Sequence, residues 1–493
     1  MADRHYIDLS DEELEYFYEI MPMKLEAYER LEELEEPRQR TEYTHRDPGY
    51  RPDEDEDPLN CIVTKCEVRG ADDGPLAGYS VGLKDNISVA GVPMTAGSPV
   101  MDDYVPDHDA IVVERLLDAG ATITAKLNMD NLSFAGSGEF SGSGPVINPH
   151  DDEYTSGGSS SGVAAAVASG EVDVALGGDQ GGSIRKPAGY CGIVGMKPTY
   201  GLVPYTGILG IGHTIDHTGP MTRTVEDAAR VLDVLAGKDP LDPRQDDVQV
   251  QDYRGALDGD VEDLTLGLLD EGFGLDISDP AVDETVRHAA EEFEALGADV
   301  RQISVPAHDD GLAIWTGCFL EEAAALWRGQ GHGFVGRGYY DTQLVEAFGK
   351  ARRVNADDFP PVLKFTLVLG EYLTEEYQSR YHAKAQNLRR ALVEAYDEAL
   401  DEVDALVLPT TPKVAPELKR DMSYREMLER VLERSMVPNT APFNATGHPG
   451  ISVPCGTKDG LPVGMHLVGR QFDDASLLRA AHAFEQATDW QDR

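Results

Sequence analysis

Hydrophobic positions along most of the chain follow two spacings, one typical of β-strands and one typical of α-helices. Strand-like apolar runs occupy residues 80–89, 121–128, 172–176, 264–271, 299–306, 404–412 and 450–457. Helical spacing is found between them, at residues 109–120 and from Pro280 to Gly297, where a proline begins the repeat and a glycine ends it. Repeated strand–helix–strand units predict an α/β fold with a mixed, mainly parallel central sheet covered by helices.

The first 60 residues follow a different pattern. Ser10 and Glu13 form a capping-box signature, and apolar residues then recur at helical spacing to about residue 35, with an interruption at Pro22. Residues 36–58 are rich in proline, arginine and acidic residues and are typical of a linker. We therefore expect a helical N-terminal extension and linker over residues 1–60. The extension either contacts another protomer or packs as a surface helix pair on its own chain.

A single large domain is expected over residues 61–493. Within it, residues 310–400 are largely helical in pattern and could cover a pocket.

Composition narrows the possible partners. The 493 residues include 89 acidic and 42 basic ones, for a net charge of −47. Binding to nucleic acid or to an anionic membrane is therefore not expected, because both need a basic surface. The acidic residues are dispersed along a chain with normal apolar periodicity, which favours an acidic shell around an ordinary core. Such a surface is typical of proteins from salt-loving organisms.

The cysteine pattern and the lack of a recognisable targeting signal predict a cytoplasmic protein. The five cysteines include no C-x-x-C pair, which favours free thiols in a reducing compartment. The chain has no apolar run of membrane-spanning length, and its N-terminus has no signal-peptide core.

The most distinctive segment is GGDQGGSIRKPAGYCG at residues 177–192, directly after the strand-like run at 172–176. A glycine loop that follows a strand brings backbone N–H groups close to a ligand. Ser183 in this loop could either close a turn or act as a nucleophile among those N–H groups. The glycines alone leave both interpretations open.

Two further segments carry candidate chemistry. TSGGSSSGVAAAVASG at residues 155–170 contains a G-x-S-x-G match that would make Ser160 a nucleophile, but the preceding NPHDDEYT lacks the strand pattern that such an elbow needs. Lys84 lies inside an apolar strand-like run. It either extends its ammonium group to the surface or is buried with a lowered pKa, in which case it could act as a base.

Together, these three segments resemble the amidase signature family. The resemblance continues through residues 214–229 and 443–470 and spans most of residues 60–490. It implies a Ser–cis-Ser–Lys triad in which Ser183 is the nucleophile, Ser159 the cis-serine and Lys84 the base. Ser161 departs from the pattern, because the family often has glycine there.

The resemblance also implies an activity and a set of partners. We expect an amidase that hydrolyses small carboxylic acid amides through an acyl-enzyme, needs no cofactor and forms a homodimer through its N-terminal helices. Gln180, Gly181 and Gly182 are expected to bind the substrate and the oxyanion. The alternative is the glutaminase A-subunit of a tRNA-dependent amidotransferase, which usually carries threonine at the position of Gln180.

Two other candidates have weaker patterns. His213 and His217 have a spacing that suits a zinc pair on a helix, but GHTIDHTGP contains no helical stretch, and we predict no metal site. Arg185 could bind a substrate carboxylate, although an ion pair that braces the loop is favoured.

Overall fold

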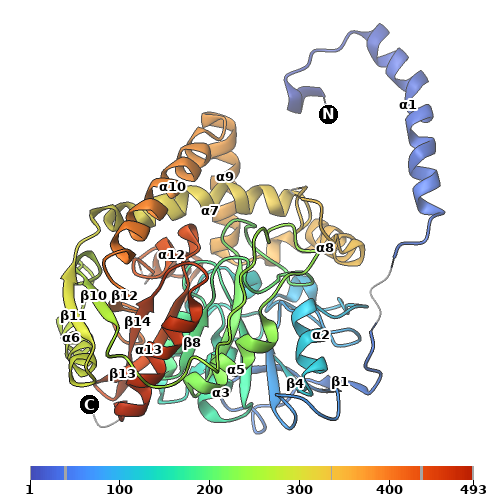
Figure 1. Ribbon diagram of the computed structural model, residues 1–493. Coiled ribbons are helices and arrows are strands. Elements are labelled where there is room, and N and C mark those ends of the chain that lie inside the picture. Colours follow the sequence, from blue (N-terminus) through green and yellow to red (C-terminus); the bar gives the residue numbers. More distant parts are fainter. Residues whose placement is uncertain (1, 38–40, 335, 434–436, 491–493) are drawn as a thin grey trace. The chain divides into compact units, whose positions relative to one another are not determined.

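The computed structural model describes residues 2–37, 41–334, 336–433 and 437–490 (Figure 1). It divides into two compact units, Met1–Arg40 and Thr41–Arg493. The first unit contains α1 (Asp11–Glu32), which begins at the predicted capping box between Ser10 and Glu13. The helix continues through Pro22, where the sequence pattern predicted an interruption. No residue of α1 is buried, so water can satisfy the carbonyl that a proline leaves without a partner.

The second unit is built on a mixed sheet, which confirms the predicted α/β fold. Its strands, within the described residues, are β1 (Arg46–Tyr50), β2 (Ile62–Arg69), β3 (Ser80–Lys84), β4 (Thr122–Leu127), β7 (Val174–Asp179), β8 (Val194–Lys197), β9 (His217–Thr222), β10 (Thr265–Leu269), β11 (Asp299–Ile303), β12 (Ala405–Pro409), β13 (Gly450–Lys458) and β14 (Leu461–Val468). Their order is β1-β2-β4-β3-β7-β9-β8-β13-β14-β12-β10-β11.

Parallel pairing is found in two groups of strands. β3 pairs in parallel with β4 and β7, and β10 pairs in parallel with β11 and β12. From β7 through β9, β8, β13 and β14 to β12, each pair is antiparallel. Strand–helix alternation predicted the two parallel groups but not the antiparallel strands between them. β13 and β14, for example, are joined by a short turn that leaves no room for a crossover helix.

The predicted linker is partly structured. β1 pairs antiparallel with β2 at the edge of the sheet, so residues 46–50 belong to the second unit, which begins at Thr41. A proline and a glycine within RDPGY hid this strand from a pattern-based prediction, although both residues are tolerated at a sheet edge.

Helices cover the sheet (Figure 1). They are α2 (Ile111–Asp118), α3 (Ser161–Ser169), α4 (Arg185–Cys191), α5 (Val225–Leu235), α6 (Pro280–Ala295), α7 (Gly311–Arg328), α8 (Thr342–Asn355), α9 (Pro361–Tyr377), α10 (Arg380–Leu400), α11 (Tyr424–Glu433), α12 (Ala441–Thr446) and α13 (Asp474–Ala487). Helices α7 to α10 fill the region where helices were expected. Both α9 and α10 pack against α7.

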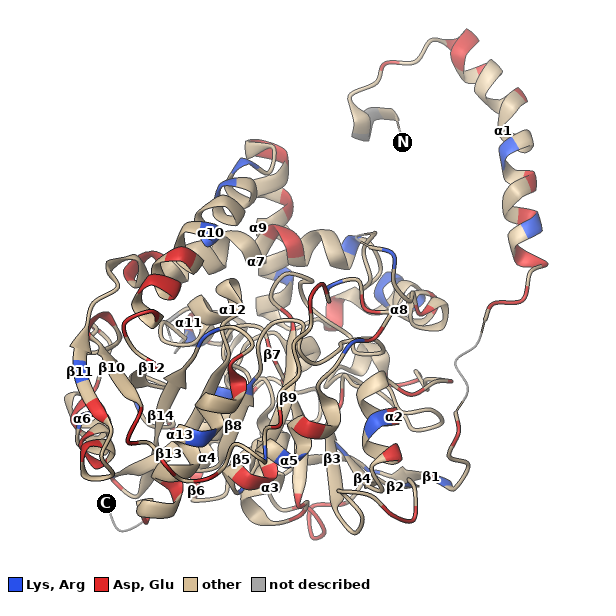
Figure 2. Cartoon of the chain, viewed as in Figure 1, with Lys and Arg blue, Asp and Glu red and all other residues tan. Residues whose placement is uncertain are grey.

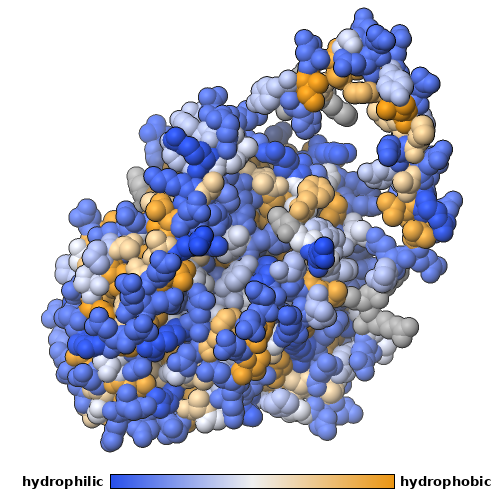
Figure 3. Space-filling view, turned by 45° about the horizontal axis from the view of Figure 1, so that its top comes forward, coloured by the Kyte–Doolittle hydropathy of each residue, from blue (hydrophilic) through white to orange (hydrophobic). Residues whose placement is uncertain are grey.

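The second unit has the acidic, mainly hydrophilic surface that its composition predicted. Acidic residues are spread over many of its helices and loops (Figure 2), and the face shown in Figure 3 is mostly hydrophilic with scattered apolar residues. All five cysteines are buried, and none forms a disulfide bond. Among the described helices, none has the length and apolarity needed to cross a lipid bilayer.

Candidate active site

The glycine-rich loop connects β7 to α4 and folds around one carboxylate. Asp179 ends β7, and its side chain accepts hydrogen bonds from the backbone N–H groups of Gly182 at 2.6 Å and Ile184 at 3.1 Å. It also forms a fully buried ion pair with Arg185, with Nε and Oδ2 3.0 Å apart. Burial alone would raise the pKa of Asp179, but the Arg185 guanidinium and the hydrogen bonds hold it well below its usual range. Arg185 therefore braces the loop, as favoured from the sequence.

Ser183 lines a cavity of about 250 Å³ together with Gln180 and Gly181. The backbone N–H groups of Gln180, Gly181 and Ser183 have no hydrogen-bond partner among the described residues. The N–H of Gly182 is already occupied by Asp179. The sequence-based expectation that Gly182 binds the oxyanion therefore disagrees with the structure, because its N–H donates to Asp179.

Lys84 and Ser159 form a direct contact beside this loop. Lys84 ends β3, and its Nζ donates hydrogen bonds to Ser159 Oγ at 2.7 Å and to the Gly178 carbonyl at 3.3 Å. The peptide bond between Gly158 and Ser159 is cis. Because β3 and β7 are parallel neighbours, their carboxyl ends lie at the same edge of the sheet, which places Lys84 next to the loop.

The environment of Lys84 changes its ionisation. The side chain is fully buried, and this burial lowers its pKa to about 7, although Asp130, Asp179 and Asp216 oppose the shift. A large fraction of Lys84 is therefore neutral near pH 7 and can accept a proton.

The segment that carries Ser159 is tied to the Ser183 loop. The N–H of Ser160 donates to the Ser183 carbonyl at 3.3 Å. The Ser160 hydroxyl donates to the Gly178 carbonyl at 3.1 Å and accepts from the Gly178 N–H at 3.2 Å. The structure thus brings Lys84, Ser159 and Ser183 close together. The Ser160 hydroxyl, by contrast, is hydrogen-bonded to the backbone of β7.

The region before Ser160 differs from the sequence-based expectation. Residues Asp151–Thr155 form the strand β6, which pairs with β5 (Ile147–Asn148) in a separate two-stranded sheet. The acidic sequence hid this strand because its outward residues are exposed. Even with this strand, Ser160 does not fit the role of a nucleophile, because its hydroxyl is buried and hydrogen-bonded.

The two candidate histidines do not form a metal site. His217 lies in β9, and its Nδ1 is 2.8 Å from the Ile215 carbonyl oxygen. His213 Nε2 is 3.1 Å from the His332 carbonyl oxygen. Within the part of the chain that the structure describes, no group of three or more His, Cys, Asp or Glu residues could hold a metal ion.

The cavity walls are mainly aromatic and aliphatic. Trp315 of α7 donates its indole N–H to the Gln180 carbonyl at 2.7 Å and stacks on Phe319, with ring centroids 5.0 Å apart. The remaining large apolar side chains in the lining are Phe134, Ile211, Leu320, Val362, Phe365, Val431, Leu432 and Val437. No aspartate or glutamate is among the described residues that line it, and its cation is Lys186.

The sequence analysis singled out Gln180 but only some of the other residues that line the cavity. The Gln180 side chain donates to the Tyr205 hydroxyl at 3.1 Å, and its buried Oε1 has no partner within the described residues. The sequence predicted Gln180 and the helical segment that covers the pocket. It did not single out Trp315, Phe319 or Lys186, because their side-chain directions depend on how α4 and α7 pack.

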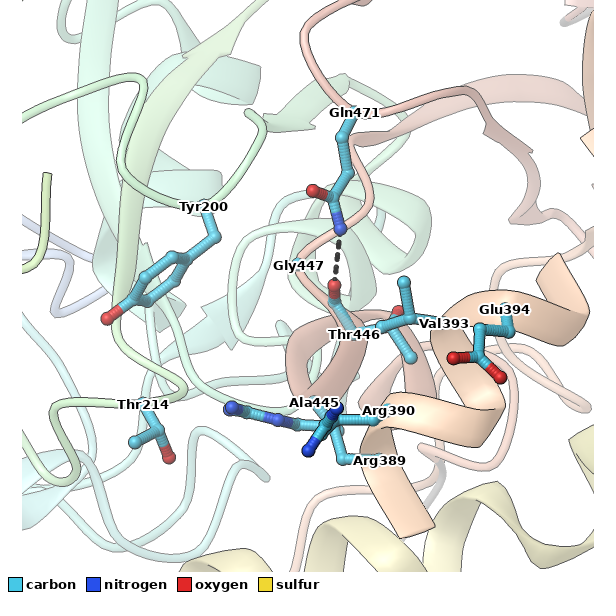
Figure 4. A pocket seen from close by; sticks show the side chains of 10 residues that line it. All are labelled: Tyr200, Thr214, Arg389, Arg390, Val393, Glu394, Ala445, Thr446, Gly447 and Gln471. Atoms are coloured by element: carbon cyan, nitrogen blue, oxygen red, sulfur yellow. Dashed lines mark hydrogen bonds between the residues drawn. The ribbon is translucent and has the colours of Figure 1, made fainter. Parts of the chain in front are cut away.

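A second cavity of about 440 Å³ lies among residues of α10, α12 and nearby loops (Figure 4). Its walls are of mixed polarity and include Arg389, Arg390 and Gln471, which donates to the Thr446 carbonyl at 2.7 Å. It shares no lining residue with the Ser183 cavity. Because Ser183 lines the smaller, largely apolar cavity, that cavity is the candidate active site.

Comparison with known proteins agrees with this geometry. The Amidase family model matches residues 63–478. The chain is 44% identical over 439 residues to an enantioselective amidase of Rhodococcus rhodochrous, covering 88% of this chain and 84% of that protein. It is 43% identical over 429 residues to the A-subunit of the glutamyl-tRNA(Gln) amidotransferase of Haloarcula marismortui, covering 86% and 99%. The crystal structure of the corresponding protein of Thermotoga maritima aligns with a TM-score of 0.72 at 32% identity, covering 87% and 88%. The chain therefore belongs to the amidase family, whose members are hydrolases of amide C–N bonds.

Proposed function

We propose that the protein is a stand-alone amidase that hydrolyses small carboxylic acid amides to carboxylate and ammonia. The observation that carries this proposal is that Ser183 lines a largely apolar cavity and that its loop is hydrogen-bonded to the segment carrying Ser159, the partner of Lys84. Such a lining suits an acyl group without a charged amino group.

The first half of the reaction forms an acyl-enzyme. Neutral Lys84 accepts the Ser159 hydroxyl proton while Ser159 accepts the proton of Ser183, whose Oγ attacks the amide carbonyl carbon. The N–H groups of Gln180, Gly181 and Ser183 stabilise the oxyanion, and one such donor typically contributes about 3–4 kcal/mol. The C–N bond then breaks, and the proton returns from Lys84 through Ser159 to the leaving amine, which departs as ammonia from a primary amide.

The second half releases the acid. Water loses a proton to Ser159 and Lys84 as its oxygen attacks the ester carbonyl of the acyl-enzyme. The Ser183–acyl bond breaks, and Ser183 recovers its proton by the same path. The unpartnered Oε1 of Gln180 supports a role in holding the substrate, since it can accept a hydrogen bond from the amide N–H of the substrate.

The second candidate function is that of a glutaminase within a tRNA-dependent amidotransferase. Its support is the high identity to proteins named as A-subunits of glutamyl-tRNA(Gln) amidotransferase. Two observations favour the amidase instead. The described cavity lining contains no carboxylate to pair with the α-ammonium of glutamine. Gln180 also occupies the position where that glutaminase usually carries threonine.

Ammonia release by the purified chain alone, in molar KCl, separates these functions. We expect release from benzamide and propionamide and none from either with the Ser183→Ala variant. Release from glutamine alone, or only in the presence of partner proteins, would replace the proposal by the glutaminase function.

We also propose that α1 forms the contact of a homodimer. Leu14, Phe17, Met21, Leu25 and Tyr28 recur at helical spacing and are each at least 41% exposed. A second copy of the helix would bury this stripe, as in other paired amphipathic helices.

The proposed setting is a salt-rich cytoplasm. The dispersed acidic surface and the five buried cysteines without a disulfide bond support it. The thermal unfolding temperature should rise with KCl concentration, and a temperature independent of salt would contradict this part of the proposal.

A further inference from the structure

We propose that Lys186 binds a carboxylate on the acyl part of the substrate, so that the preferred substrates are monoamides of dicarboxylic acids. This inference rests on the proposed function, because it names the substrate class of the Ser183 cavity.

Lys186 is held close to the candidate nucleophile. It lies in the first turn of α4, one helical turn after Ser183, and its backbone N–H donates to the Gly182 carbonyl at 2.8 Å. Both Lys186 and Ser183 line the same cavity. A group bound to the ammonium would therefore belong to the same molecule as the amide that Ser183 attacks.

The Lys186 ammonium differs from the other buried lysines of the described chain in having no partner. Lys84 donates to Ser159, Lys126 forms an ion pair with Asp85 at 2.9 Å, and Lys197 donates to the Pro198 carbonyl at 3.0 Å. Lys186 is only 4% exposed, yet no hydrogen bond or ion pair joins its ammonium group to a described residue. A buried cation without a partner is costly, and a ligand that brings a negative charge removes that cost.

The two carboxylates that favour the charged form of Lys186 bind other groups. Asp130 accepts the backbone N–H groups of Gly138 and Phe140, each at 3.1 Å through Oδ1, and Asp179 is paired with Arg185. Neither carboxylate lies within ion-pair distance of Lys186, although both favour its charged form. Burial lowers the pKa of Lys186 to about 8, which leaves most of the side chain protonated at pH 7.

The ammonium lies close to Gly136 in the cavity wall. A Cβ atom added to Gly136 would lie 3.0 Å from Lys186 Nζ, and Gly136 also lines the cavity. The rest of the lining is dominated by apolar side chains and contains no described aspartate or glutamate. We therefore infer a ligand with one anionic end and a hydrocarbon spacer, since no carboxylate among the described lining residues would pair with an α-ammonium group.

Matched substrates test this assignment. Benzamide is compared with the monoamide of benzene-1,4-dicarboxylic acid, and pentanamide with the monoamides of butanedioic and pentanedioic acids. Glutamine, which adds an α-ammonium to the pentanedioic monoamide, completes the set. We expect the wild type to have a kcat/KM at least about tenfold higher for the best monoamide than for its neutral partner, as one charged hydrogen bond can provide.

Variants then assign the effect to Lys186. Lys186→Met should lower kcat/KM for the monoamides by at least about tenfold more than it lowers kcat/KM for benzamide, while Lys186→Arg should retain the preference. Lys384→Met, at an exposed position of α10, is the matched control and should change neither class. An equal loss for both substrate classes in Lys186→Met, or no preference in the wild type, would overturn the assignment.

A binding measurement separates this inference from the proposed function. Calorimetry with Ser183→Ala should detect the benzene-1,4-dicarboxylic monoamide, with binding weakened by about tenfold or more when Lys186→Met is added. Equal binding with and without Lys186 would overturn the carboxylate site. Binding that depends on Lys186, together with a wild type that hydrolyses no amide, would retain the site and overturn the proposed amidase instead.

Discussion

The Lys84 ammonium nitrogen lies 2.7 Å from the Ser159 hydroxyl oxygen, at the carboxyl edge of two parallel strands. The residues are far apart in sequence, and β3 carries one of them while the segment before α3 carries the other. This contact gives a buried lysine one specific hydroxyl group to exchange protons with, and the predictions that follow depend on it.

The rate of amide hydrolysis should depend on the ionisation of Lys84. Burial lowers its pKa to about 7, and only the neutral form can accept a proton, so kcat/KM should rise with pH through an apparent pKa of about 7. Activity should accordingly be lost as the pH falls below this value. A pH–rate profile on benzamide checks this. A profile with no ascending limb near pH 7, or with a limb near the ordinary lysine pKa, would show that Lys84 is not the base.

Ser159 and Ser160 should respond oppositely to removal of their hydroxyl groups. Ser159→Ala removes the acceptor of the Lys84 hydrogen bond and should lower kcat on the order of 10³-fold or more. Ser160→Ala removes two hydrogen bonds to Gly178 and should cost about 1–3 kcal/mol of stability while activity at low temperature remains. Steady-state kinetics and denaturant unfolding of both variants distinguish the roles. Loss of catalysis in the Ser160 variant alone would restore the G-x-S-x-G interpretation.

The ion pair between Arg185 and Asp179 should stabilise the fold and the loop that carries Ser183. Arg185→Met leaves a buried carboxylate without its partner and should reduce the free energy of unfolding by about 3–5 kcal/mol. Arg425→Met is the matched control, because its pair with Glu429 is largely exposed and should contribute little. Urea unfolding measures both. Equal effects of the two substitutions would contradict the bracing role.

Deletion of residues 1–40 should abolish dimerisation and leave catalysis intact. The deleted segment is a compact unit of its own, and its helix buries no residue. The truncated chain should therefore retain benzamide hydrolysis and run as a monomer, whereas the full chain should run as a dimer. Light scattering and kinetics on both chains check this. A truncated chain that is still dimeric would place the contact elsewhere.

The loop that carries Ser183 could be located in the sequence because it follows a short, regular strand. The strand before residue 179 was visible in VDVAL, and Lys84 stood out as a charge in an apolar run. Both features come from local periodicity, which does not depend on the rest of the fold. The resemblance to the amidase signature family then supplied the roles that local patterns left open.

The pattern could not give the details set by tertiary packing. β1 was hidden by its proline and glycine, and β6 by its acidic residues, because both strands pair at sheet edges where apolar alternation is not needed. Asp179 accepts the Gly182 N–H, and Lys186 lines the cavity, because of the way the loop folds around Asp179 before α4 begins. Such directions do not follow from residue spacing.

Acylation of Ser183 is the step on which the proposed mechanism depends, and mass spectrometry can detect it. The protein is mixed with a phenyl ester of benzoic acid, which acylates faster than an amide. The mixture is quenched in acid within the first turnover and digested. We expect one benzoyl group on the peptide that contains Ser183, lost in Ser183→Ala and strongly reduced in Ser159→Ala. A benzoyl group on Ser159 or Ser160 in the wild type, or none on Ser183, would contradict it.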